Sequence, residues 1–161
     1  MRAALASVLA LLLAACGFQL RGTADLPFQT IYVPGATGGI ALEVKREIEA
    51  GSHTRVVDDP KQAQAQLQIT QETQGSQILA LDVNGRVREL RLLYTVSFRV
   101  VDPKGGDFVP PTTVQLGRDV TYNDADILAK QAEQTLLYRD MQTDMVQQIM
   151  RRLAASKAPK A

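Results

Sequence analysis

The feature that most constrains the fold is the dipeptide Asn84-Gly85, which lies between two alternating apolar and polar runs, 77–83 and 86–101. Asn-Gly readily adopts the positive φ angles of a type I′ turn, so the sequence predicts a two-residue β-hairpin. One face of its second strand is predicted to carry Leu90, Leu92, Tyr94, Val96, Phe98 and Val100. A long hairpin with one apolar face is therefore expected at the centre of the fold.

Further strands and two helices are predicted around this hairpin. Short apolar or alternating runs predict strands at 29–33, 55–57, 65–70 and 112–122. An amphipathic helix is expected to begin at Thr37 or Gly38 and to end before Gly51, which would serve as its C′ residue.

A second, longer helix is expected to begin at Asn123 or Asp124, either of which can cap it. Its predicted apolar side consists of Ile127, Leu128, Tyr138, Met145, Val146, Ile149 and Leu153. One helix early and one late, with strands between them, predict an α+β fold in which two helices cover one face of a mostly antiparallel sheet.

The N-terminus has the pattern of an export signal. Arg2 precedes an apolar run, 3–13, that is too short to span a bilayer. The run ends in Leu13-Ala14-Ala15-Cys16, which resembles a bacterial lipobox. By that resemblance, residues 1–15 are a cleaved signal peptide and the Cys16 thiol carries a diacyl lipid. Cleavage leaves a free α-amine on Cys16, which can take a third acyl chain. The alternative is a buried core cysteine after an ordinary signal.

The rest of the chain is expected to form one domain. Residues 16–28 would be a lipidated N-terminal segment, 29–155 a single α+β domain and 156–161 a polar tail. Two or more acyl chains hold a protein stably at a bilayer. By resemblance to other bacterial lipoproteins, Gly17 is not the aspartate that retains such proteins at the inner membrane, so the expected place is the outer membrane, facing the periplasm.

Composition and motifs argue against several functions. After removal of 1–15, the 18 basic residues fall to 17, equal to the 17 acidic ones, so nothing suggests a nucleic-acid partner. The single histidine, His53, belongs to no metal-ligand motif, and no nucleotide-binding or serine-nucleophile motif occurs. We expect neither an enzyme nor a bound cofactor or metal, and a binding or structural protein instead.

The segment Cys16-Gly17-Phe18-Gln19-Leu20-Arg21 resembles the opening of the LPS-assembly lipoprotein family, LptE, also called rare lipoprotein B. The Asn84-Gly85 hairpin, the long alternating strand and the helix start at Tyr122-Asn123 extend the resemblance. It implies two helices on a sheet of about four strands. It also implies that the chain plugs the outer-membrane barrel LptD, supports its assembly and helps place lipopolysaccharide in the outer leaflet.

Three basic residues are the candidate contacts for lipopolysaccharide. A two-residue turn would place Arg86 opposite Val83 and Arg88 opposite Leu81, so an apolar strip would end in two cations. By resemblance, Lys130 matches the family's lysine in the last helix, whereas Val83 stands where the family has a basic residue before Asn-Gly. The alternative for each cation is a solvated surface position.

Two other functions remain open from the sequence. The chain could be an envelope adaptor or structural lipoprotein that binds peptidoglycan or another periplasmic protein. An enzyme is a distant third, because no residues converge on a recognisable catalytic site.

Overall fold

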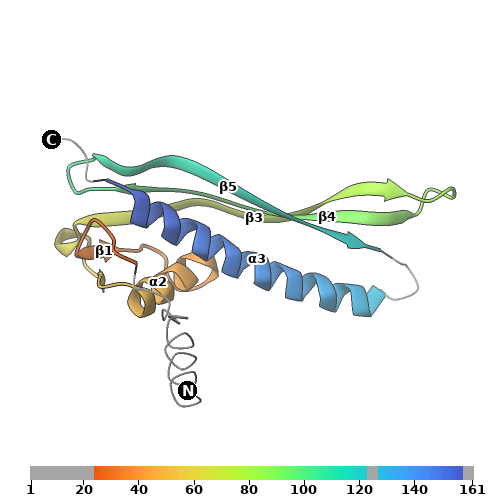
Figure 1. Ribbon diagram of the computed structural model, residues 1–161, viewed down its shortest axis with the longest axis horizontal. Helices are drawn as coiled ribbons and strands as arrows, with labels where there is room; N and C mark the ends of the chain where they lie inside the picture. The colour runs from red at the N-terminus through yellow and green to blue at the C-terminus, as the bar shows by residue number, and fades with distance from the viewer. Residues whose placement is uncertain (1–23, 123–126, 158–161) are drawn as a thin grey trace, which may run out of the picture.

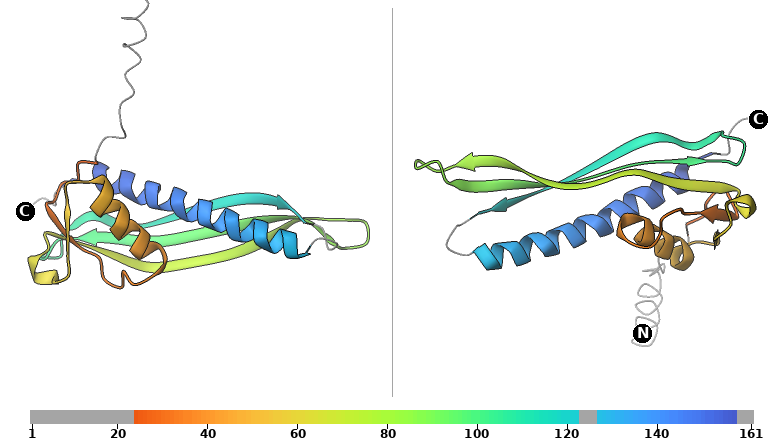
Figure 2. Two further views of the ribbon diagram at one scale, coloured as in Figure 1. Left: turned by 90° about the horizontal axis from the view of Figure 1, so that it is seen from below. Right: turned by 180° about the vertical axis from the view of Figure 1, so that it is seen from behind.

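A five-stranded sheet with two helices on one face forms the domain (Figures 1 and 2). The computed structural model describes residues 24–122 and 127–157. The elements are β1 (Thr30–Tyr32), α2 (Gly39–Gly51), β2 (Arg55–Val57), the 3₁₀ turn η1 (Pro60–Gln62), β3 (Ala65–Leu81), β4 (Val87–Val101), β5 (Asp107–Thr121) and α3 (Ile127–Ala155). The lipobox, Cys16 and the predicted start of the second helix at 123–126 lie outside the described residues.

The strand order is β2-β1-β3-β4-β5. The long strands β3, β4 and β5 run antiparallel as one meander, whereas the three-residue β1 is parallel to both β2 and β3. The α+β class and the two helices on one face are confirmed. In detail the sheet is mixed and has five strands, because α2 returns the chain so that β2 joins β1 in parallel.

The predicted apolar face of β4 is confirmed. Its residues from Leu92 to Val100 alternate between buried and less buried positions, and the buried ones face the helices. The second half of α3 covers them with Met141, Met145, Ile149 and Leu153, all fully buried. The strict period of two in β4 thus produces one side of the core, and a helical period produces the other.

Two predicted strands, 65–70 and 77–83, are one continuous strand, β3. β3 pairs with β4 over almost its whole length, with a register irregularity beside Thr70. The residues between the two predicted strands, 71–76, have no apolar side chain, which is why the sequence suggested two separate strands.

The first half of α3 departs from the prediction. Ile127 and Leu128 were expected on the apolar side, but they are 44% and 82% exposed. α3 has 29 residues and α2 only 13, so the N-terminal part of α3 extends beyond the core (Figure 1). Periodicity predicted the stripe correctly from Met145 onward, but it cannot show where the surface opposite a helix ends.

The ends of α2 also differ from expectation. Gly51 is the last helical residue and not a C′ glycine; Ser52 follows in an extended conformation and donates its hydroxyl to the Ile48 carbonyl at 2.7 Å. At the other end no residue of the helix's own segment caps it with a side chain. Instead, the Glu72 carboxylate of β3 accepts the Ile40 N–H at 3.1 Å.

Candidate functional site at the hairpin end

The turn between β3 and β4 is a three-residue loop, and the predicted two-residue turn is wrong. The Asp82 N–H donates to the Arg86 carbonyl at 2.8 Å, and the Gly85 N–H donates to the Asp82 carbonyl at 3.0 Å. Gly85 has a φ of +78°, but no described non-glycine residue, Asn84 included, has a positive φ. A type I turn followed by a left-handed glycine has this geometry.

Asp82 fixes the loop from within. Its Oδ1 accepts the N–H groups of Asn84 at 2.8 Å and Arg86 at 2.9 Å. The Arg86 N–H is the main cause of a lowered pKa at the Asp82 carboxyl; the Asn84 N–H and the Arg88 charge lower it further, while desolvation opposes them. The carboxylate therefore stays ionised well into acid and keeps both bonds.

The same arrangement closes the next hairpin. The Asp102 N–H donates to the Gly106 carbonyl, and the Gly105 N–H donates to the Asp102 carbonyl. The Asp102 Oδ1 accepts the N–H groups of Lys104 and Gly106. Both turns share the pattern Asp-x-x-Gly, a known type I turn signature that could have identified the first loop from the sequence.

The loop changes the predicted neighbours of the arginines. Leu81 pairs with Val87 rather than with Arg88, and Arg86 lies opposite Asp82 rather than Val83. A register irregularity at Leu79 and another at Arg88 shift the two strands relative to a regular ladder. The strip that was predicted to end in two cations is therefore rearranged, although apolar residues and cations still lie side by side.

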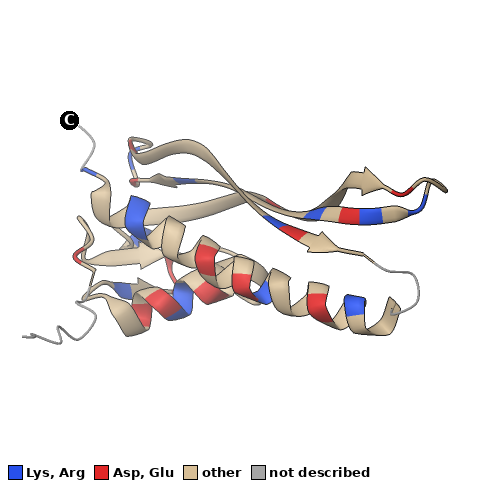
Figure 3. Cartoon of the chain, turned by 45° about the vertical axis from the view of Figure 1, so that its right-hand side comes forward, with Lys and Arg blue, Asp and Glu red and all other residues tan. Residues whose placement is uncertain are grey.

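Arg88 and Lys130 lie at the same end of the molecule. The Tyr122 N–H donates to the Arg88 carbonyl at 2.8 Å, and Lys130 Nζ lies 3.4 Å from the Thr121 hydroxyl, so both residues adjoin the end of β5. Figure 3 shows basic residues on the hairpin and on the nearby start of α3. Hydrogen bonds to the neighbouring residues Tyr122 and Thr121 thus hold Arg88 and Lys130 beside the same end of β5.

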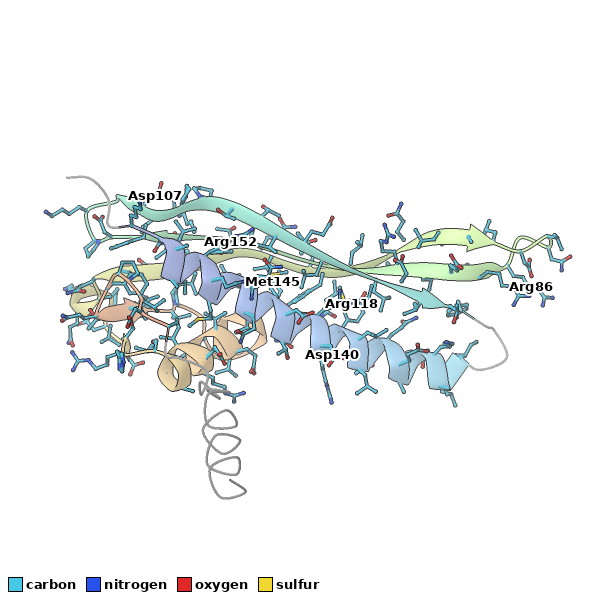
Figure 4. The ribbon with its side chains drawn as sticks, viewed as in Figure 1. Arg86, Asp107, Arg118, Asp140, Met145 and Arg152 are labelled. Carbon is cyan, nitrogen blue, oxygen red and sulfur yellow. The ribbon has the colours of Figure 1, made fainter. Side chains whose placement is uncertain are left out.

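The three cations differ in how far they are paired. Lys130 Nζ is 2.8 Å from Glu133 Oε2, and its side chain is 21% exposed. Arg88 Nη2 lies 3.7 Å from Asp82 Oδ2. Arg86, at the tip (Figure 4), makes no ion pair or side-chain hydrogen bond with another described residue. Arg86 therefore has the guanidinium most available to an incoming anion.

Large exposed apolar side chains gather at this end. Among the described residues they are Ile78, Leu79, Leu81, Val83, Ile127, Leu128 and Leu136. All belong to the hairpin tip or to the first third of α3, the two segments that extend beyond the core. Large apolar side chains exposed together at one end of a domain are typical of an interaction site.

The described residues include no group of three or more potential metal ligands. Within the same ranges, no helix is both long enough and apolar enough to cross a membrane.

Comparison with known proteins identifies the family. A family profile described as "LptE: Lipopolysaccharide-assembly" matches residues 28–153. The chain belongs to the LptE family. Its sequence relatives include the LPS-assembly lipoprotein LptE of Pectobacterium atrosepticum, which is 28% identical over 148 residues, covering 89% of this chain and 79% of the relative.

Solved structures of lipoproteins share the LptE-family fold seen here. The NMR structure of an uncharacterized lipoprotein B from Nitrosomonas europaea is 37% identical, with a TM-score of 0.74 over 86% of this chain and 91% of that one. The crystal structure of a minor lipoprotein from Acinetobacter baumannii is 25% identical, with a TM-score of 0.66 over 84% and 98%. The LptE-family match includes the hairpin and the start of α3, so Arg86, Arg88 and Lys130 all lie within the shared domain.

Proposed function

We propose that this chain is an outer-membrane lipoprotein that partners and plugs the LptD β-barrel, supports its assembly and contacts lipopolysaccharide directly. The observation that carries the proposal is the gathering of Arg86, Arg88 and Lys130 with exposed apolar side chains at one end of an LptE-family domain. A glycolipid that bears both phosphates and acyl chains requires cations beside apolar surface.

The barrel partnership is supported by the polar outer face of the sheet. On β4 this face carries Thr95 and Ser97 between Leu93 and Arg99, and their partners on β3 and β5 are mainly glutamine and threonine. The interiors of outer-membrane barrels are polar, so a domain with such a face suits enclosure in a barrel.

The proposed lipid anchor would lie toward the opposite end of the domain from the hairpin tip. Cys16, the residue we propose to be lipidated, lies eight residues before Ala24, a reach of at most about 29 Å. Ala24 donates its N–H to the Gly51 carbonyl at the C-terminal end of α2, toward the opposite end of the molecule from the hairpin tip (Figure 1). The hairpin would therefore point away from the leaflet that holds the lipid. Mass analysis of the mature N-terminal peptide tests the lipid itself.

Purification from outer membranes tests the partnership. The chain is expected to co-purify with a large β-barrel in detergents that leave barrels folded, and cross-links from the hairpin tip should reach that barrel. Recovery free of any barrel, with cross-links to peptidoglycan instead, would contradict the proposal and favour the envelope-adaptor alternative.

Reversing charge at the hairpin end should weaken lipopolysaccharide binding. In the triple variant Arg86→Glu, Arg88→Glu, Lys130→Glu, phosphate would meet three anions, and we expect the dissociation constant to rise at least about a hundredfold, corresponding to about 2.7 kcal/mol. Circular dichroism should show an unchanged fold, because Arg86 and Arg88 are exposed, Lys130 is only partly buried, and none of the three belongs to the apolar core.

A matched control reverses three cations at the other end of the domain: Lys45→Glu, Arg55→Glu and Lys104→Glu. These side chains lie away from the hairpin tip, so binding should stay close to that of the parent chain. Equal binding by both triple variants would remove the hairpin end from the site.

A further inference from the structure

The outer face of the sheet contains a row of three residues with only one side chain. Leu93 of β4 pairs with Gly75 of β3 on one side and with Gly117 of β5 on the other. Paired residues of antiparallel strands point to the same face, so both neighbours of Leu93 lack a side chain there. Leu93 and Gly117 line a shallow trough of about 520 Å³ on this face, and Gly75 continues the row beside it.

The fold does not require either glycine. Neither has a positive φ; a Cβ at Gly75 would meet no atom within 4 Å, and one at Gly117 would approach Arg91 Cδ at an ordinary 3.5 Å. Glycine in the interior of a strand weakens it, and such a position often marks the close approach of a ligand or another backbone. Two glycines that flank one leucine therefore indicate an occupant above the sheet.

Polar side chains line the trough on both sides of this row. On the tip side, Arg91 and Asp119 form a bidentate pair, with Nε–Oδ1 at 2.6 Å and Nη2–Oδ2 at 2.8 Å, and Gln77 is the other partner of Arg91. The hydrogen bond between the two raises the pKa of the guanidinium and lowers the pKa of the carboxyl, so both stay charged. On the other side Gln115 donates its amide to the Thr95 hydroxyl at 3.1 Å.

The chemistry of this lining excludes several ligand classes. Each cation of the lining is held in an ion pair, Arg91 with Asp119 and Arg118 with Asp144, so an anion would meet a carboxylate beside either one. The amides of Gln77 and Gln115 and the Arg91–Asp119 pair offer hydrogen-bond donors and acceptors, and the apolar part of the lining consists of Leu93 and Leu116. A sugar ring matches this pattern, because its adjacent hydroxyls both donate and accept hydrogen bonds and its C–H face is apolar.

The trough also suits a chain rather than a compact molecule. β5 is an edge strand, and β1 pairs only with the first two residues of β3, so β4 is the only strand beside β3 at Gly75. The glycine row thus crosses all three strands and reaches an edge of the sheet on each side; at the β3 edge the Gly75 carbonyl accepts the Tyr138 hydroxyl at 2.6 Å.

We propose that this trough binds the neutral saccharide chain of lipopolysaccharide, across the row Gly75–Leu93–Gly117. The identity of the ligand rests on the function proposed above, and it extends that function from the phosphates and acyl chains to the sugars. The site is distinct from the hairpin end and uses none of its three cations.

The test uses the mature full-length chain in detergent, labelled with ¹⁵N and ¹³C. The probe is lipid-free, dephosphorylated saccharide released from lipopolysaccharide by mild acid. Saturable shifts are expected for the Gln77 and Gln115 amides and the Leu93 methyls. No shift at these groups at saturating saccharide would overturn the proposal.

Filling the trough gives the sharper result. The Gly75→Val variant should bind the saccharide at least about tenfold more weakly, because its side chain would occupy the space beside Leu93 without meeting another atom. Gln77→Ala should also weaken binding, whereas its matched control Gln71→Ala, three rows away on the same face, should not. Undiminished binding by Gly75→Val would overturn the site.

Two further probes separate this proposal from the function on which it rests. Lipid A without its saccharide chain should bind Gly75→Val as well as the parent chain, and equal losses for both probes would overturn a separate sugar site. Soluble peptidoglycan glycan is expected not to shift the trough, and shifts from it alone would overturn the assigned source. Failure of lipid A to bind the parent chain would instead count against the proposed lipopolysaccharide contact.

Discussion

Replacing Val96 by Asp is expected to prevent the domain from folding at ordinary temperatures. Val96 is fully buried on the helix-facing side of β4, and nothing in the apolar core around it can pair with a carboxylate. We expect a loss of more than about 4 kcal/mol from a total stability of about 5–15 kcal/mol. Thermal and urea unfolding followed by circular dichroism measure it.

The control is Thr73→Asp, which introduces the same carboxylate at a β-branched residue on the outer face of β3. Thr73 is exposed and pairs with Thr95, so its change should alter stability by no more than about 1 kcal/mol. Native-like unfolding of the Val96→Asp variant would show that the helix-facing side of β4 is not the core.

Replacing Glu72 by Ala should produce the second largest loss of stability. Glu72 Oε1 accepts the hydroxyl of the fully buried Tyr94 at 2.7 Å, and the same carboxylate caps α2 through the Ile40 N–H. Burial, and then the neighbouring carboxylate, raise the pKa of Tyr94 far above its usual value, so the hydroxyl remains a donor. Removing the Glu72 carboxylate leaves the buried Tyr94 hydroxyl without a hydrogen-bond acceptor. We expect the free energy of unfolding to fall by about 1–3 kcal/mol.

Two variants separate the contributions of Glu72. Glu72→Gln keeps an oxygen acceptor and should lose less stability than Glu72→Ala. Tyr94→Phe removes the hydroxyl, so adding Glu72→Ala to it should cost only the cap, about 1 kcal/mol. Strictly additive losses in this cycle would contradict a direct Tyr94–Glu72 bond.

The position of Gly39 follows from the same carboxylate. Gly39 has a φ of +60°, and a Cβ there would lie 2.6 Å from Glu72 Oε2. Only glycine lets the carboxylate of β3 approach the start of α2 this closely. This contact joins residues 32 positions apart in the sequence, which explains why periodicity alone did not reveal it.

Sequence patterns predicted the parts of the fold that repeat. The alternation of β4 identified its buried face, and helical spacing identified the stripe of α3 from Met145 to Leu153. Both signals extend over many residues, so single exceptions do not obscure them.

Features that depend on tertiary context were missed. The parallel strands β1 and β2 have three residues each, too few for the sequence to show how they pair. Leu128 is apolar and fits the helical spacing, but it is exposed because α2 is too short to reach it. Lys130 was placed correctly in the last helix, but its pairing with Glu133 was not foreseen. The trough around Leu93 required the register of three strands, which a single-strand pattern does not contain.

The two Asp-x-x-Gly turns have a consequence for how the domain folds. Asp82 and Asp102 each close their loop with bonds to residues at most four positions away, so neither turn needs the helices in order to form. The pairing of β4 with both neighbours can therefore start from local loops, whose closure is fast and loses little chain entropy. We expect the three-strand meander to align early in folding, and β1 and β2, which need partners far along the chain, to join late.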